Sequence, residues 1–245
     1  MRFLLAFAIS LFLTVPARAG DVASARPLGF SPGGAYFAFS QSGVQDGSGF
    51  AYADVFVIDT ARDAWVKGTP VRVLIRNETS TGADALRMAM RRAAGVLRKL
   101  KITGGGNMTI LAHNPLTEWS ADPKRVAFSL SAENPTVYSA YRLRLIAFDV
   151  PMKDCESYGA KARGFRLVLS PWKGTGGRVI HADKAGARLP KSRGCALDYR
   201  ITHVISHDGV SPKQGIPLVA LVEVFAHGFE GRDGRFIALP FFIRN

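Results

Sequence analysis

Residues 218–225, Leu-Val-Ala-Leu-Val-Glu-Val-Phe, form the most apolar run of the chain after its first 19 residues. Apolar runs of this length that are rich in valine are typical of strands. The wider segment 216–229 is interrupted by Pro217, by Gly228 and by two polar residues. A membrane-spanning helix needs about 20 apolar residues, so the sequence predicts no transmembrane segment in the mature chain.

Further short apolar runs lie on both sides of this strand, separated by turn sequences such as Ser31-Pro32-Gly33-Gly34. Strands are predicted at residues 36–39, 52–58, 71–75, 108–112, 125–130, 138–150, 165–169, 199–206, 218–225 and 235–243. This pattern predicts a mainly β fold, an antiparallel sandwich or barrel-like domain with one inserted helix. We expect residues 20–245 to form a single β-rich domain.

The inserted amphipathic helix is predicted at about residues 82–101. Thr81 and Asp84 resemble a capping box with aspartate in place of glutamate, and the glycines at 104–106 end the segment. One helix face is apolar and carries Leu86, Ala89, Met90, Ala93, Val96, Leu97 and Leu100. The opposite face has no acidic residue after Asp84 and carries Arg87, Arg91, Arg92, Arg98 and Lys99.

Residues 1–19 have the layout of a secretory signal peptide. Arg2 precedes an apolar run, Pro16 ends that run, and Ala17-Arg18-Ala19 places small residues just before a cleavage site. The run is short for a membrane span, although an uncleaved anchor is the alternative. We expect cleavage after Ala19 and a mature protein that is periplasmic or secreted.

The chain is strongly basic. Its formal net charge is +13, and the loss of Arg2 and Arg18 with the signal peptide leaves +11. A charge excess of this size raises the affinity for polyanions. Outside the cytoplasm we expect no nucleic acid partner, but an anionic envelope component such as lipid phosphate or lipopolysaccharide, or an envelope protein. The alternative is that the charge only keeps the protein soluble.

Two groups of basic residues are candidates for anion binding. Arg142 and Arg144 share one face of a predicted strand, and Arg166 lies on the next one, so together they suit phosphate or carboxylate groups. The basic helix face is the second candidate because it lacks acidic partners at i,i+4 spacing. The alternative for both groups is an ordinary solvated surface.

Cys155 and Cys195 are the two cysteines of the chain. In an oxidising compartment this even number suggests one disulfide, which would close a loop of about 40 residues and stabilise the fold by roughly 4 kcal/mol. Two buried free thiols are the alternative. Neither cysteine belongs to a Cys-x-x-Cys pair, which argues against redox catalysis and against zinc binding.

Glu223 is the acidic residue within the most apolar run. A buried carboxylate needs a partner or a raised pKa. We expect Glu223 to lie on a solvated or edge face, and the alternatives are a buried pair with an arginine and a catalytic acid.

No residue pattern identifies a catalytic, cofactor or metal site. Residues 170–173 have the spacing of a Ser-x-x-Lys acylation motif, but Pro171 and the glycines that follow oppose the helix that this motif needs. His203 and His207 are four residues apart in a predicted strand, roughly 13 Å and too far for one metal ion. We therefore predict no catalytic residue, no cofactor and no metal.

Part of the chain resembles a known repeat unit. Residues 30–39, Phe-Ser-Pro-Gly-Gly-Ala-Tyr-Phe-Ala-Phe, followed by residues 54–59, Asp-Val-Phe-Val-Ile-Asp, resemble one blade of the periplasmic Tol-type β-propellers. This resemblance implies a partial propeller-like β domain as an alternative fold.

Nearly the whole chain resembles a family of predicted secreted bacterial proteins described only as a domain of unknown function. The segments that carry this resemblance are residues 43–50, residues 114–118 with Asp122-Pro123, and residues 228–231. The resemblance implies export and supplies no activity and no site residues.

These observations favour an exported, non-enzymatic binding or interaction protein of the cell envelope, with an anionic ligand. One alternative is a scaffold that docks other envelope proteins through its strand edges. The other is a secreted hydrolase that uses a carboxylate such as Glu223.

Overall fold

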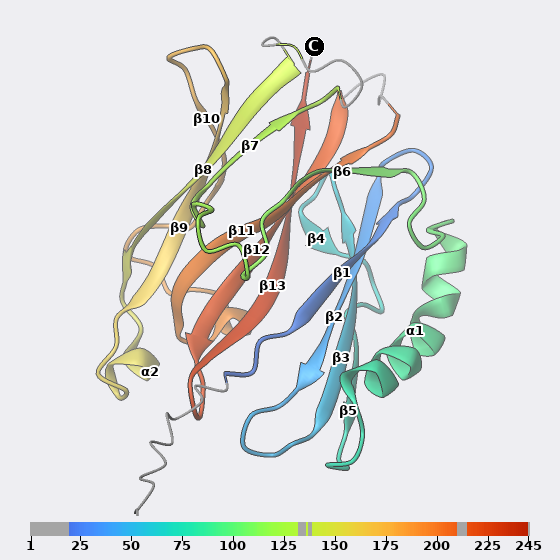
Figure 1. Cartoon of the computed structure of the whole chain (residues 1–245), viewed down its shortest axis with the longest axis vertical. Helices are drawn as coiled ribbons and strands as arrows, with labels where there is room; N and C mark the ends of the chain where they lie inside the picture. The colour runs from blue at the N-terminus through green and yellow to red at the C-terminus, as the bar shows by residue number, and fades with distance from the viewer. Residues whose placement is uncertain (1–19, 132–135, 137–138, 210–214, 245) are drawn as a thin grey trace, which may run out of the picture.

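The computed structural model describes residues 20–131, 136, 139–209 and 215–244 (Figure 1). The predicted signal peptide, residues 1–19, and the first residue of the strand predicted at 138–150 lie outside these ranges. The described residues form three antiparallel sheets, one long helix and two short helical segments, α2 (Lys153–Glu156) and a 3₁₀ turn (Lys191–Arg193). The predicted mainly β fold is confirmed.

The three sheets are called the N-terminal, central and outer sheets. The N-terminal sheet consists of β1 (Ser24–Phe30), β2 (Tyr36–Val44), β3 (Ala51–Asp59), β4 (Ala64–Trp65) and β5 (Val71–Ile75), with β5 paired to β3. The central sheet has the order β13 (Arg232–Ile243), β12 (Ile216–His227), β11 (Ala196–His207) and β6 (Met108–His113). The outer sheet has the order β10 (Arg178–Ala182), β9 (Ala162–Pro171), β8 (Ala140–Val150) and β7 (Arg125–Ser129).

The central sheet lies between the other two, and helix α1 (Gly82–Lys99) covers the far face of the N-terminal sheet (Figure 1). The apolar run of β12 accounts for this arrangement. Leu218 and Val222 pack in the core shared with the outer sheet, whereas Val219 and Leu221 pack in the core shared with the N-terminal sheet. A strand that is covered on both faces must be apolar at successive positions.

Helix α1 forms where the sequence predicts it. The Thr81 hydroxyl accepts a hydrogen bond from the Asp84 backbone, and the Asp84 carboxylate accepts one from the Thr81 backbone at 2.8 Å. This capping box satisfies two amides that the first helical turn leaves unpaired. Ala85, Ala89, Ala93 and Leu97 recur every four residues and are buried in the core that the helix shares with the N-terminal sheet.

The two alternative folds are not supported. None of the three sheets formed by the described residues closes into a barrel. The blade-like residues 30–59 fall in a β1–β2–β3 meander of a sheet that packs face to face against the central sheet, and such layers are typical of a sandwich rather than of radial propeller blades. The chain therefore has a sandwich-like β fold with a third sheet and a helix added.

The predicted disulfide joins two layers. Cys155 in α2 is bonded to Cys195, which lies just before β11, and their Cα atoms are 5.3 Å apart. The bridge ties the end of β8, in the outer sheet, to the start of a central-sheet strand. Both cysteines pack in the core between these two sheets.

Candidate functional site

The exposed side of the outer sheet carries four arginines. Register places Arg144 of β8 directly opposite Arg125 of β7, and Arg142 lies two residues before Arg144 on the same face. Arg166 of β9 is paired with Ile146 of β8, which is two residues after Arg144, so Arg166 lies diagonal to Arg144. Neighbouring strands are about 5 Å apart and same-face residues about 7 Å apart. We call Arg125, Arg142, Arg144 and Arg166 the arginine face.

The arginine face has little acidic compensation. Arg125 lies 3.5 Å from Asp122, whereas Arg142, Arg144 and Arg166 have no ion pair within the described part of the chain. Trp172, 45% exposed, lies 4.7 Å from the Arg142 guanidinium, a cation–π distance. The predicted basic strip of three arginines is thus one face, and Arg125 extends it.

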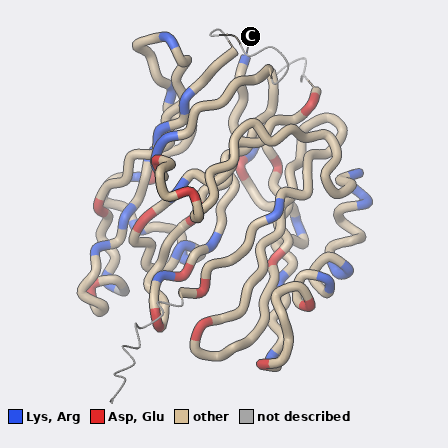
Figure 2. The backbone as a smooth tube through the Cα atoms, viewed as in Figure 1, with Lys and Arg blue, Asp and Glu red and all other residues tan. Residues whose placement is uncertain are grey.

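The basic residues of α1 form a separate surface. Arg87, Arg91, Arg92, Arg98 and Lys99 are exposed on the side of the helix that faces away from the N-terminal sheet. Within the described residues, only Arg87 of these five pairs with an acid, Asp84. Because α1 and the outer sheet are the two outermost layers, these residues and the arginine face lie on opposite sides of the molecule (Figures 1 and 2). The predicted anion-binding residues therefore do not form a single site.

The expectation that Glu223 lies on a solvated or edge face is wrong. Its side chain is 1% exposed, and β12 is an interior strand of the central sheet. Register places it opposite Arg200 of β11, but no ion pair joins the two side chains. Arg200 instead donates to the Asn114 side chain at 2.8 Å, to the Asn114 backbone carbonyl at 3.1 Å and to Pro115.

The buried Glu223 carboxyl is only weakly compensated. Its Oε1 has no hydrogen-bond partner among the described residues. Burial raises the pKa of Glu223 to about 7, against the opposing effect of the Arg200 charge. A Cβ atom at Gly234 would lie 2.6 Å from Oε1, so the carboxyl packs directly on the backbone of β13 and would have to shift if residue 234 had a side chain.

Asp183 is an acid with a largely buried side chain that no sequence pattern indicates. It accepts hydrogen bonds from Arg193 at 2.6 Å and from the Phe165 backbone at 2.9 Å, and His181 lies 3.5 Å away. Burial alone would raise the pKa of Asp183, but the hydrogen bonds from His181, Arg193 and Phe165 outweigh it and lower the pKa to about 2. No local pattern marks Asp183, because its partners come from β9, β10 and the 3₁₀ turn.

The histidines and the Ser-x-x-Lys residues have structural contacts. His203 stacks on His113 of the neighbouring strand at 4.3 Å, and burial, with the nearby His113 charge, lowers the pKa of His203 to about 4. His207 hydrogen-bonds the Gly209 carbonyl at 2.8 Å. Residues 170 and 171 end β9. Among the described residues no group of three or more His, Cys, Asp or Glu side chains could hold a metal ion.

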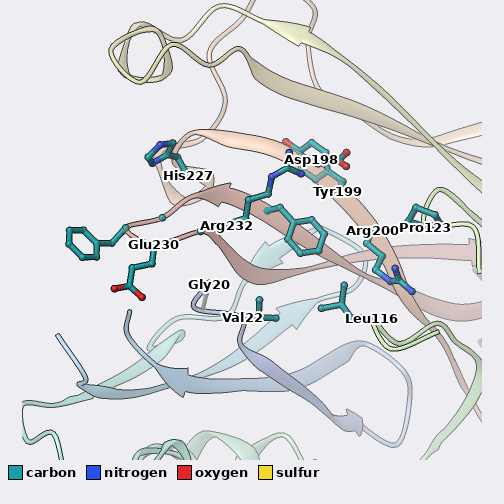
Figure 3. Close-up of a pocket in the computed structure, with 14 residues that line it drawn as sticks. Gly20, Val22, Leu116, Pro123, Asp198, Tyr199, Arg200, His227, Glu230 and Arg232 are labelled. Atoms are coloured by element: carbon teal, nitrogen blue, oxygen red, sulfur yellow. The ribbon is translucent and has the colours of Figure 1, made fainter. Parts of the chain in front are cut away.

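A cavity of about 810 Å³ opens beside the β12–β13 turn (Figure 3). Val22, Leu116, Pro123, Phe225 and Phe229 contribute apolar wall, and Arg200 and Arg232 contribute positive charge. No sequence pattern predicts this cavity, because its walls come from four segments that are far apart in the chain.

The segments that carry the family resemblance meet at this cavity. Leu116 and Pro123 of one segment and residues 228–231 of another line it directly. The third segment supports the turn, because Asp46 accepts a hydrogen bond from the Glu230 backbone at 2.7 Å. Three stretches of sequence therefore shape one region of the surface.

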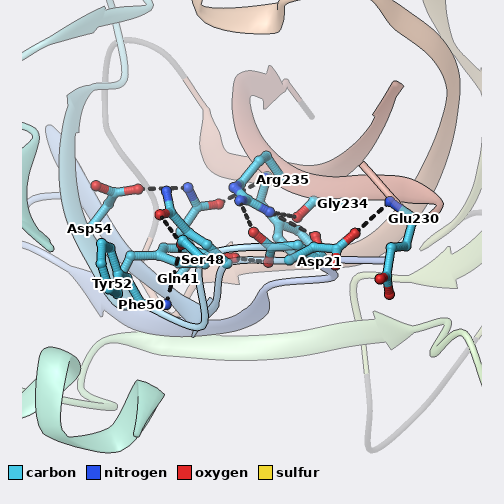
Figure 4. Close-up of polar contacts among 12 residues, drawn as sticks. Asp21, Gln41, Ser48, Phe50, Tyr52, Asp54, Glu230, Gly234 and Arg235 are labelled. Atoms are coloured by element: carbon cyan, nitrogen blue, oxygen red, sulfur yellow. Dashed lines mark hydrogen bonds and ion pairs between the residues drawn. The ribbon is translucent and has the colours of Figure 1, made fainter. Parts of the chain in front are cut away.

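The chain enters the fold next to the same cavity. Asp21 is buried and accepts a hydrogen bond from Tyr52 at 2.7 Å, and Arg235 donates to its backbone carbonyl at 2.8 Å and pairs with its carboxylate (Figure 4). Gln41 continues this polar cluster by donating to Asp54 at 2.9 Å. These contacts attach the first described residues to the N-terminal and central sheets.

A smaller cavity of about 430 Å³ is also lined by arginines, but their charges are compensated. The ion pairs are Arg72 with Asp54, Arg193 with Asp183, and Arg235 with Asp21. An anionic ligand there would compete with three existing carboxylates. This cavity is therefore a weaker candidate for anion binding than the arginine face.

The fold and surface define a mainly β protein with a disulfide, a helical cover and two basic outer layers. The chain belongs to the family described as Predicted secreted protein (DUF2259), a domain of unknown function, whose model matches residues 38–241. No curated protein and no solved structure matches the chain. No helix of the described residues has the length and apolar character that a membrane crossing requires.

Proposed function

We propose that the protein is exported and works as a non-enzymatic binding protein that attaches to phosphate-bearing lipid surfaces of the cell envelope through its arginine face. The family description supports export. The observation that carries the binding proposal is the register of the outer sheet, which makes Arg125, Arg142, Arg144 and Arg166 neighbours on one exposed face.

An anionic ligand would relieve charge repulsion within this face. Like charges on adjacent strands destabilise a sheet, and Arg144 and Arg125 are direct cross-strand neighbours. Phosphate oxygens fit the donor geometry of a guanidinium, and each basic residue near an anionic membrane contributes about 1 kcal/mol. Val179 of β10 and Trp172, which directly follows β9, are exposed beside these arginines, and tryptophan favours the interface between headgroups and acyl chains.

The helix face is the weaker candidate for the same role. In the described chain no large hydrophobic side chain is exposed on α1, and Asp84 compensates Arg87. Because α1 and the outer sheet are opposite outer layers, a flat surface can contact only one of them. The arginine face combines uncompensated charge with exposed apolar groups, which favours it.

The hydrolase alternative has no support from Glu223. The carboxyl is buried between sheets and lines neither of the two large cavities. A general acid must come within hydrogen-bond reach of its substrate. The scaffold alternative would be supported if the arginine face contacts an envelope protein and does not bind lipid vesicles.

The test is sedimentation of the mature protein with phosphatidylcholine vesicles, with and without phosphatidylglycerol. We expect salt-sensitive binding that requires the anionic lipid. The triple variant Arg142→Glu, Arg144→Glu, Arg166→Glu should bind about 100-fold more weakly, because three favourable contacts of about 1 kcal/mol are lost. Vesicles of lipopolysaccharide form a second arm, since they offer the same phosphate chemistry on another lipid.

The matched control is the variant Arg91→Glu, Arg92→Glu, Arg98→Glu on α1, which has the same net charge. It should retain most of the binding. Equal losses in the two variants would mean that only net charge matters, and a larger loss in the α1 variant would assign the contact to the helix. If vesicles do not bind and crosslinking in cells captures an envelope protein through the arginine face, the scaffold function replaces this proposal.

The export part has its own test, the N-terminal sequence of the mature protein. We expect it to begin at Gly20. Cleavage beyond Asp21 would remove the carboxylate that Tyr52 and Arg235 bind, so a mature chain that starts after residue 21 would contradict the expectation. A full-length protein recovered from the cytosol would contradict export itself.

A further inference from the structure

The cavity beside the β12–β13 turn is a second candidate binding site, independent of the arginine face. Its volume of about 810 Å³ lies within the range of small-molecule sites. It is built from residues 20–22, the β6–β7 loop, β11 and the β12–β13 hairpin. A cavity of this size, open to solvent and lined by four segments, has room for a ligand of drug size.

The apolar walls of the cavity are unusually exposed for large side chains. Phe229 is 81% exposed and Leu116 is 47% exposed, and Val22 is also exposed. Phe225 and Pro123 add further apolar surface. Contiguous exposed apolar groups around a concave site mark a place where an apolar ligand is buried.

The charges in the cavity favour an anion. Arg200 is buried, and the Asn114 and Pro115 contacts use its Nε and Nη2 but not its Nη1, which has no hydrogen-bond partner in the described part of the chain. Arg232 is exposed and has no ion pair within the same residues. Glu223 does not pair with Arg200, so the guanidinium charge remains available.

The two acids that line the cavity reduce this positive charge only in part. Asp198 is paired with Lys124. Glu230 is exposed and lies at the opposite end of the cavity from Arg200 (Figure 3). Arg200 therefore lies at the Leu116 end of the cavity, whereas Arg232 lies on the β12–β13 hairpin that also carries Glu230.

We propose that this cavity binds an amphiphile with one anionic group, placed at Arg232, and an apolar body that packs against Val22 and Phe225 and extends toward Leu116. A medium-chain carboxylate or alkyl phosphate has this chemistry. The ligand is a single molecule in a cavity, whereas the arginine face contacts a surface, so the two proposals stand or fall separately.

The test is calorimetric titration of the mature protein with dodecanoate below its micelle concentration. We expect saturable one-to-one binding and no comparable binding of dodecyltrimethylammonium, which has the same chain and the opposite charge. Dodecyl phosphate forms the arm that separates a phosphate ligand from a carboxylate ligand. Equal affinity for the cationic amphiphile, or no binding of any of the anionic probes, would overturn the proposal.

Three exposed positions allow variants that leave the fold intact. Arg232→Ala should weaken dodecanoate binding about tenfold, because a charge-assisted hydrogen bond is lost, and Leu116→Asp should weaken it at least as much. Glu230→Gln should tighten binding, because a repulsive charge is removed. Unfolding curves for each variant confirm that it is folded, and unchanged affinities in folded Arg232→Ala and Leu116→Asp proteins would sink the assignment.

The matched control is Arg166→Ala on the outer sheet. It should leave dodecanoate binding unchanged while it weakens vesicle binding. An equal loss of dodecanoate binding in Arg166→Ala would show that the amphiphile recognises net charge and not the cavity. Failure of vesicle binding with intact dodecanoate binding would remove the proposed surface function and leave this inference standing.

Discussion

Asp183 and Glu223 are carboxylates with largely buried side chains, each next to a buried arginine, yet their environments are opposite. Asp183 is bonded to Arg193, and its pKa falls to about 2. Glu223 faces Arg200, whose hydrogen bonds go to Asn114 and Pro115, and its pKa rises to about 7. Proximity to an arginine therefore does not ionise a buried acid. Whether the acid ionises depends on which acceptors the guanidinium N–H groups bind.

The largest effect that tests this comparison is the loss of the Asp183 pair. In Asp183→Asn, Arg193 keeps its buried charge without a counterion, which costs about 3–5 kcal/mol. Urea unfolding at neutral pH measures the free energy of unfolding. The control is Asp149→Asn, an exposed residue 3.9 Å from Arg163, which should change stability by about 0.5 kcal/mol or less. Similar losses in both variants would refute a strong buried pair.

The disulfide affects the same region. Cys195 follows Arg193 by two residues, so the bridge to Cys155 holds the segment that carries the guanidinium. Closing a loop with a sequence separation of 40 stabilises the fold by at most about 4 kcal/mol. Unfolding with and without reductant measures this difference, and mass spectrometry of the exported protein should show both thiols oxidised. Free alkylatable thiols, or identical unfolding curves, would contradict the bridge.

The titration of Glu223 should lower the free energy of unfolding as the pH rises, whereas that of Asp183 lowers it as the pH falls. Its pKa is raised from 4.5 to about 7, so the folded state holds its proton over a range in which the unfolded state has lost it. The stabilisation is complete below pH 4.5 and is lost as pH rises to about 7, and 2.5 units correspond to about 3 kcal/mol. Glu223→Gln keeps the shape without the titration. It should abolish this decline and be the more stable protein above pH 7; a persisting decline would assign the titration to another group.

The smallest effect is the acid limb of wild-type stability. The pKa of Asp183 is lowered from 3.8 to about 2, so its contribution is complete above pH 3.8 and is lost as pH falls through about 2. This loss amounts to about 2 kcal/mol. Glu223→Gln should retain the loss and Asp183→Asn should lack it. An acid limb that persists in Asp183→Asn would assign the loss to another group.

Local patterns were sufficient for the elements of the fold. The capping residues Thr81 and Asp84 and the four-residue recurrence of alanines place α1 within two residues of its observed end. Period-two alternation likewise put Arg142 and Arg144 on one strand face. These predictions hold because caps, helical spacing and strand alternation depend on residues close together in the chain.

The position of Glu223 could not be predicted in this way. Alternation along a strand puts Glu223 on the same face as Val219 and Leu221, which pack against the N-terminal sheet, but it does not reveal that a second sheet covers this face. The same limit applies to Arg125, which joins the arginine face through its pairing with Arg144, and to Leu116, which reaches the cavity through a loop. Each depends on segments that are brought together only by folding.

By itself, the sequence determined the apolar run of β12, the basic helix face, the one possible cysteine pairing and the resemblance to secreted proteins, because these are properties of composition and of neighbours in the chain. Only the tertiary structure decided that β12 is covered on both sides, that the two basic surfaces are opposite, and that Asp183 and Glu223 differ in pKa. The physical reason is that burial and electrostatic energy depend on distances through space, which the stacking of the three sheets sets.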